Sequence, residues 1–229
     1  MDRLTPALQA QLRDALSHLP HPVTLKLFVQ DGSMASHACT DAVDLANEIA
    51  SNSGGKVTVA RHDVDSEPEV ASQFAITRTP AIVVLGGEEG QTDYGIRLFG
   101  APDGYEFATL VEDIRMASRG DVDLMPATRD VLAHLTQPLH IQVFVTPTCP
   151  YCPRAAVLAH SLAVASPHVV ADVIDASEFP VLANYYRVRG VPRTVVNDRV
   201  EIEGALPESA FLAQLLPLFE EAGVPASLT

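Results

Sequence analysis

The sequence predicts an α/β protein made of two copies of one unit, each with a mixed four-stranded central sheet and flanking helices. Three observations predict this class. The 229 residues are 47% apolar, which suffices for a core and suits two domains of roughly 100–115 residues. Segments of the first half recur in the second half, as with Cys39 and Cys152, and with Asp63 and Asp175. Within each copy, alternating apolar segments typical of strands are separated by helical stretches.

Each copy is expected to have the element order β-α-β-α-β-β-α, after an amphipathic helix at the N-terminus within residues 1–19. The leading two strands should be parallel, with a right-handed crossover, and the last two antiparallel. In the first copy the expected segments are the strand 24–29, helix 39–50, strand 56–65, a short helix within 63–80, strands 81–86 and 95–100, and helix 104–117. In the second copy they are the strand 140–145, helix 152–163, strand 168–177, a short helix within 175–192, strands 194–198 and 200–204, and helix 207–222.

The link between the copies lies in residues 118–135, where Gly120 and Pro126 are breakers. We therefore expect one domain over residues 1–119 and a second over 120–229.

The charge and composition exclude several classes of function. A net charge of −14, spread over both halves, offers no basic patch to nucleic acid or to an anionic membrane. No apolar run approaches the ~18 residues of a membrane span. Three cysteines do not form a disulfide framework of the secreted kind, so we expect a cytoplasmic protein. In that setting a cysteine pair is typically catalytic, redox-sensing or metal-binding.

The second copy contains such a pair, Cys149 and Cys152, directly after a strand and at the start of a helix. Disulfide exchange needs a thiolate, and a helix N-terminus favours the anion. Two intervening residues place the second sulfur one turn away, where it can resolve a mixed disulfide. Pro150 and Pro153 are both expected in the first helical turn, where proline is tolerated. We predict that Cys149 attacks the substrate and that Cys152 resolves.

Four arginines are expected around this pair: Arg154, Arg187, Arg189 and Arg193. Positive charge stabilises a thiolate, and we assign this tuning role to Arg154 and Arg193. The alternative is that these side chains are simply solvated.

Half of a zinc site is the alternative interpretation of the pair. Tetrahedral zinc needs two further ligands, usually as a second close pair. The candidates His140, His160 and His168 do not show that spacing. We therefore expect no metal.

Val191-Pro192 is the second element of the predicted site, and Thr79-Pro80 has the same place in the first copy. A cis peptide bond there would aim the Val191 backbone at the sulfurs, although most X–Pro bonds are trans.

These residues carry a family resemblance. Cys149-Pro150-Tyr151-Cys152 after a strand, with a later Val191-Pro192 before a hairpin, resembles the glutaredoxin branch of the thioredoxin superfamily. Residues 95–107 are similar to a signature of two-unit protein disulfide oxidoreductases. They are also similar to the N-terminal domain of the flavoprotein component of alkyl hydroperoxide reductase. The stretch at 203–205 departs from the Gly-Gly-Asp pattern of glutaredoxins.

The resemblance implies two tandem thioredoxin-like folds that carry out thiol–disulfide exchange. It implies no bound cofactor beyond the redox-active disulfide, which a thioredoxin-reductase-like, flavin-dependent reductase would reduce. The implied partners are protein disulfide substrates, that flavoprotein, and a peroxiredoxin. The residues expected to frame the substrate groove are Thr148, Pro150, Tyr151, Val191 and Pro192.

The first copy has a degenerate site, because Ser36 replaces the attacking cysteine and oxygen cannot exchange disulfides. Its remaining members are Cys39, Thr79 and Pro80, with His37 in the loop. Cys39 has three interpretations: a buried small side chain, a regulatory thiol, or a partner of Cys149 or Cys152. The first copy is then a candidate docking surface.

The sequence thus predicts a protein thiol–disulfide oxidoreductase. One alternative is a dedicated electron carrier that reduces a peroxiredoxin; without a GxGxxG motif it would need a separate reductase. A second alternative is a non-enzymatic binding or chaperone module. Whether the protein oxidises, reduces or isomerises depends on its reduction potential and stays open.

Overall fold

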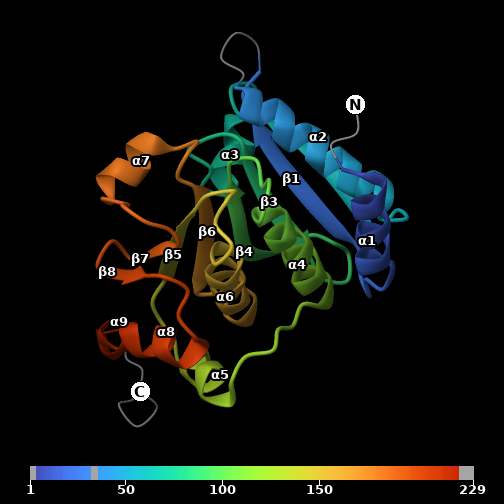
Figure 1. Ribbon diagram of the computed structural model, residues 1–229. Coiled ribbons are helices and arrows are strands. Elements are labelled where there is room, and N and C mark those ends of the chain that lie inside the picture. Colours follow the sequence, from blue (N-terminus) through green and yellow to red (C-terminus); the bar gives the residue numbers. More distant parts are fainter. Residues whose placement is uncertain (1–3, 32–35, 222–229) are drawn as a thin grey trace.

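A single eight-stranded sheet runs through the computed structural model, which describes residues 4–31 and 36–221 (Figure 1). The strand order is β2-β1-β3-β4-β6-β5-β7-β8. The strands are β1 (Val23–Val29), β2 (Val57–Asp63), β3 (Ala81–Gly86), β4 (Thr92–Phe99), β5 (Leu139–Val145), β6 (Val169–Asp175), β7 (Arg193–Val196) and β8 (Val200–Glu203).

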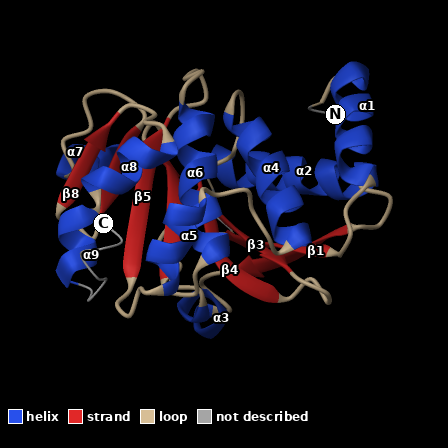
Figure 2. Cartoon of the chain, turned by 90° about the horizontal axis from the view of Figure 1, so that it is seen from below, coloured by secondary structure: helices blue, strands red, loops and turns tan. Residues whose placement is uncertain are grey.

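The helices cover both faces of the sheet unequally, as Figure 2 shows for α3 on one side and α4 and α6 on the other. Buried residues of α3 and α7 belong to one apolar cluster, whereas those of α1, α2, α4, α5, α6 and α8 belong to the other. The helices are α1 (Pro6–Ser17), α2 (His37–Asn52), α3 (Pro68–Gln73), α4 (Glu106–Arg119), α5 (Pro126–Ala133), α6 (Cys152–Ala165), α7 (Pro180–Tyr185), α8 (Glu208–Gln214) and α9 (Leu216–Glu221).

The expected repeat is confirmed element by element. In each half the leading strands are parallel, β1 with β2 and β5 with β6, and the closing hairpins are antiparallel. One difference is that the expected helix 207–222 is divided into α8 and α9. Pro217 lies at the second position of α9 and cannot donate an N–H to the preceding turn, so a continuous helix is interrupted there. Residue 222 lies outside the described part.

The two halves are joined by pairing between β4 and β6, which the sequence did not indicate. These strands are parallel, with Ile96 opposite Ala171 and Phe99 opposite Ile174. Gly95 allows the approach, because a Cβ there would lie 2.7 Å from the Val169 carbonyl oxygen. Two four-stranded sheets therefore form one continuous sheet.

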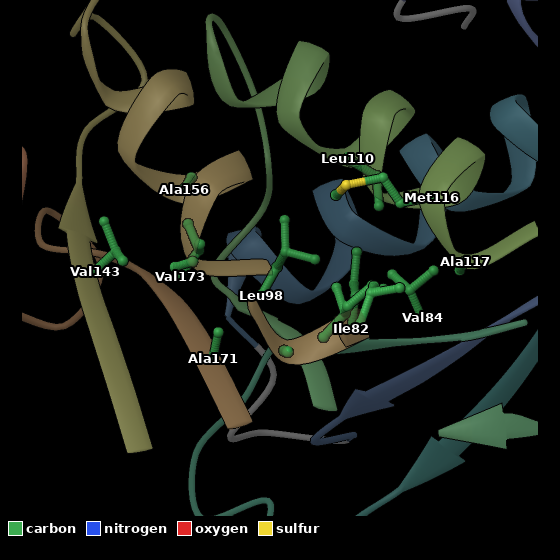
Figure 3. Packing of buried hydrophobic residues seen from close by; sticks show 14 of the residues in the cluster. Ile82, Val84, Leu98, Leu110, Met116, Ala117, Val143, Ala156, Ala171 and Val173 are labelled. Carbon is green, nitrogen blue, oxygen red and sulfur yellow. The ribbon is translucent and has the colours of Figure 1, made fainter. Parts of the chain in front are cut away.

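Helices α4 and α6 pack against each other over this seam. Figure 3 shows Leu110 and Met116 of α4, Ala156 of α6, and Leu98 and Val173 from the strands beneath them. All five belong to one cluster of buried residues that draws on both halves. The core is thus shared.

The proposed boundary after residue 119 coincides with the end of α4, where Gly120 caps the helix in a left-handed conformation. That residues 1–119 and 120–229 are separate domains stays a prediction, since the sheet and core are continuous across them. In the part of the chain with assigned structure, no helix has the length and apolarity needed to cross a membrane.

Candidate active site

Cys149 and Cys152 lie between the end of β5 and the first turn of α6 and are joined as a disulfide. Their Cα atoms are 5.5 Å apart. Cys149 retains 8% of its surface exposed, whereas Cys152 is fully buried. A partner coming from solvent therefore meets the Cys149 sulfur first, and Cys152 lies behind it.

The helix begins at Cys152 and not earlier. Pro153 lies in the first turn as expected, but Pro150 lies two residues before the helix start, so its expected place is wrong. Further upstream, the Cys149 N–H donates to the Thr146 carbonyl oxygen (3.1 Å) and closes a separate turn. The pair still straddles the helix start, where N–H groups without intrahelical partners favour an anion.

Val191 is brought to the cysteines by a cis Val191-Pro192 peptide bond. The carbonyl oxygen of Val191 is 3.7 Å from the Cys149 sulfur. Thr148, Pro150 and Tyr151 are exposed beside Cys149, with 65% of Tyr151 accessible. Val191 is half-buried and Pro192 is buried. These five residues are thus grouped at the reactive sulfur, and their role as a substrate groove stays a prediction.

The arginines divide into two groups. Arg193 is 8% exposed, and its guanidinium donates to Glu203 (2.6 Å) and to Glu201. Those two carboxylates hold it within the β7–β8 hairpin, and its expected role in thiolate tuning stays a prediction. Arg154, like Arg187 and Arg189, is exposed. Its tuning role stays a prediction.

The first copy reproduces the backbone of this site without its chemistry. Ser36 is the N-cap of α2: its Oγ accepts from the Cys39 N–H at 3.2 Å and lies 3.4 Å from the Cys39 sulfur. Thr79-Pro80 is also cis, and His37 is exposed. Cys39 is a buried free thiol. Since Cys149 and Cys152 are bonded to each other, Cys39 is a partner of neither in this state.

A segment of the first half contacts the active-site loop of the second. The N–H of Tyr105 donates to the Pro147 carbonyl oxygen, two residues before Cys149, at 2.9 Å. Gly104 has a φ of 58°, and a Cβ there would lie 2.3 Å from the same oxygen. Only glycine fits that approach without displacing the loop. Residues 95–107 were identified from the sequence as a family signature. In the structure, Gly104 and Tyr105 of this signature contact Pro147 in the active-site loop.

Glu106, which follows in this segment, is a buried acid that the sequence analysis missed. Its side chain lines a cavity of about 10 Å³, room for about one water molecule, together with Val145, Pro147 and Asp175. Thr109 donates to its Oε2 at 2.9 Å. Burial raises the pKa of Glu106 to about 7, and the Thr109 hydrogen bond opposes that rise. No sequence signal linked Glu106 to the second site, because it comes from the other half.

We expect Glu106 to make stability depend on pH. Its folded pKa lies above the ordinary value of 4.5, so its contribution is present in full below about pH 4.5. It is lost as the pH rises through about 7, by on the order of 3 kcal/mol. Urea unfolding at pH 5 and pH 8 should show that Glu106→Gln removes this part of the dependence.

The matched control is Glu69→Gln, which changes an exposed glutamate of α3. It should retain the pH dependence of the unaltered protein. Equal slopes for Glu106→Gln and Glu69→Gln would contradict the prediction.

A metal site is not formed by the described residues: over 4–31 and 36–221, no three His, Cys, Asp or Glu side chains are grouped to hold an ion. Of the three histidines considered, His160 pairs with Asp113 and His140 with Asp172, while His168 is exposed. The three histidines therefore do not come together as ligands of one metal ion.

Comparison with known proteins supports the thioredoxin family through a family model and through sequence relatives. A family model for the thioredoxin domain matches residues 139–217. Thioredoxin from Methanocaldococcus jannaschii is 34% identical over 73 residues, which are 31% of this chain and 86% of that protein. A component of alkyl hydroperoxide reductase from Staphylococcus epidermidis is 27% identical over 173 residues, 75% of this chain. The chain covers only 31% of that relative's length.

Two solved structures are similar over almost the whole chain. The NTD_N/C domain of alkylhydroperoxide reductase from Enterococcus faecalis has a TM-score of 0.83 at 25% identity, covering 93% of this chain and 99% of that one. A protein disulfide oxidoreductase from Aeropyrum pernix has a TM-score of 0.83 at 27% identity, covering 96% and 94%. The similarity includes both halves and their relative arrangement.

Proposed function

From the premise that this chain belongs to the thioredoxin family, we propose that it is a protein thiol–disulfide oxidoreductase that works through Cys149 and Cys152. One observation carries the proposal. The two sulfurs are joined at the start of α6, with the Val191 carbonyl oxygen 3.7 Å from the outer one. That arrangement combines an accessible sulfur, a resolving sulfur and a backbone acceptor beside the attack position.

The reductive direction balances as follows. The Cys149 thiolate attacks one sulfur of a substrate disulfide, and the other leaves as a thiolate that takes up a proton. Cys152 loses its proton and attacks Cys149, which releases the second substrate thiol and forms the disulfide seen here. Two electrons pass from the protein to the substrate. A flavin-dependent reductase, as the source of two electrons, would restore the dithiol.

The proton of Cys152 needs an acceptor near the buried sulfur. Glu106 lies beside the active-site loop, and burial raises its pKa to about 7. Its cavity is bounded by Val145 and Pro147, which lead into the active-site loop. We propose that the first half supports this loop, in addition to the docking role that remains a hypothesis.

The direct test is reduction of insulin disulfides by the full chain with dithiothreitol as reductant. We expect precipitation of the insulin B chain well ahead of a sample with dithiothreitol alone. A titration against glutathione or dithiothreitol buffers should also give a two-electron transition of the pair. Absence of both results would support the non-enzymatic alternative.

A second candidate function is transfer of electrons to a peroxiredoxin, favoured by the similarity to components of alkyl hydroperoxide reductase. A kcat/KM for an oxidised peroxiredoxin far above that for insulin would support it. We also propose a cytoplasmic location, from the cysteine usage, and a thioredoxin-reductase-like partner, from the family.

A further inference from the structure

We infer that the second half prefers disulfide substrates with acidic residues beside the disulfide, and that exposed arginines around Cys149 select them. This inference rests on the proposed function and names the substrate class for the same site. The arginines are Arg154, Arg187 and Arg189, hereafter the arginine rim.

The rim consists of positive charges that the protein leaves without carboxylate partners. The chain has 29 acidic and 15 basic residues, so acids are in excess. Six other arginines are bound to carboxylates: Arg61 to Asp31, Arg97 to Asp172, Arg115 and Arg119 to Glu112, Arg129 to Asp121, and Arg193 to Glu201 and Glu203. Within the described residues, the exposed side chains of the rim form no ion pair or hydrogen bond with a carboxylate.

The rim lies in the two segments that hold the reactive sulfur. Arg154 follows Cys152 by two residues on α6. Arg189 precedes Val191 by two residues, and the Val191 carbonyl oxygen is 3.7 Å from the Cys149 sulfur. These arginines are exposed and close along the chain to both segments of the site, which makes them candidates for contact with a polypeptide bound at Cys149.

The two halves of the chain provide an internal comparison for the turn that contains Arg187. Arg187 (φ 53°) aligns with Ala75 (φ 51°), and both follow a short helix in the left-handed conformation. The closing hydrogen bonds also match: the residue after Arg187 donates back at 2.8 Å, and the residue after Ala75 at 2.9 Å. The same turn thus forms with alanine, so arginine is not required for the fold.

The left-handed position itself disfavours arginine. Residues with a side chain are rare at φ near +55°, and glycine is the usual choice after a helix end of this type. The backbone at position 187 therefore does not favour the side chain that the sequence places there.

At the other two rim positions, too, the second half has an arginine and the first half has a residue without positive charge. Arg189 aligns with Thr77, and Arg154 aligns with Asp41, an acid. At the three aligned positions the second half has arginine where the first half has Ala75, Thr77 and Asp41. The first half instead carries Arg78, which aligns with Gly190 and packs over the Phe99 ring. The protein as a whole carries a net charge of −14 and repels acidic substrates, so a local positive rim is what would orient an acidic segment at Cys149.

The experiment uses the full chain and three disulfide-bridged peptides of equal length, with Glu, Gln or Lys on both sides of the disulfide. For the unaltered protein, kcat/KM should be about 3- to 10-fold higher for the Glu peptide than for the Gln peptide. The Lys peptide should be the slowest, and raising salt should reduce the differences.

The test variant is Arg187→Gly combined with Arg189→Thr, which gives the turn a favoured glycine and the residue of the first half. It should lose most of the preference for Glu while the Gln peptide changes less than about two-fold. The control Arg115→Gln with Arg119→Gln removes the same charge from exposed α4 positions and should keep the preference.

Three results would overturn the inference. Equal rates for the Glu and Gln peptides in the unaltered protein exclude selection, while the proposed function stands. An equal slowing of all three peptides in the variant shows that the arginines act on the thiolate and not on the substrate. If the unaltered protein reduces none of the peptides, the proposed function fails together with the inference.

Discussion

We expect Cys149→Ser to reduce disulfide exchange to the uncatalysed background, a loss of several orders of magnitude. The reason is that the serine hydroxyl cannot form or leave a disulfide, and the fully buried Cys152 has too little surface to replace Cys149. The measurement is insulin reduction with dithiothreitol, followed by precipitation of the B chain. Turnover at the unaltered rate would refute the proposed mechanism.

Cys152→Ser separates the attacking from the resolving step. Cys149 can still attack, but the mixed disulfide has no neighbouring thiol to release it, so the adduct accumulates. Mass spectrometry under non-reducing conditions should show the protein plus one substrate molecule. The control is Cys39→Ala, which removes the buried free thiol of the first half and should leave the exchange rate unchanged. A lower rate in that control would restore the interpretation of Cys39 as a regulatory thiol.

We expect His160→Leu to lower the free energy of unfolding by about 3–5 kcal/mol, because it leaves a buried carboxylate without its cation. His160 Nδ1 on α6 lies 2.8 Å from Asp113 Oδ1 on α4, and both side chains are fully buried. His160 Nε2 lies 3.3 Å from the Arg97 carbonyl oxygen on β4. The pair therefore connects the two halves beneath the helices that cover the seam. Urea unfolding measures the effect.

The double variant Asp113→Leu with His160→Leu is the informative comparison. Replacing both members removes the uncompensated charge and restores most of the lost stability. Burial raises the pKa of Asp113, so the cost of His160→Leu alone should grow with pH as that carboxyl ionises. The exposed control His168→Gln should stay within about 0.5 kcal/mol of the unaltered protein. Equal stabilities for His160→Leu and this control would show that the pair does not hold the halves together.

Much of the fold follows from local patterns in the sequence. The strands alternate or are continuously apolar, and helices such as α2 begin at a side chain that caps them, so short segments suffice to place them. The repeat then fixes the order of elements, because each helix or strand supports the assignment of its counterpart. The cysteine pair is equally local: two sulfurs three positions apart at a helix start need no distant residue to be recognised.

The sequence does not specify which surfaces of the two units meet. The parallel pairing of β4 with β6 joins residues such as Ile96 and Ala171 that are far apart along the chain. The sequence of neither strand indicates which other strand it pairs with. Buried polar contacts between halves, such as His160 with Asp113, are specified only once the seam forms. The division of the arginines also depends on the folded arrangement, since ion pairing of Arg193 is a matter of neighbours in space.

By itself, then, the sequence determined two repeated α/β units, one complete cysteine pair and one degenerate copy, because hydrogen bonding within elements and the chemistry of sulfur act over a few residues. Only the tertiary structure decided that the units share one sheet, that Glu106 lies beside the other unit's active-site loop, and that Arg187 and Arg189 have no carboxylate partner among residues 4–31 and 36–221. The physical reason is that burial and charge pairing depend on distances through space, and those distances exist only after the chain has folded.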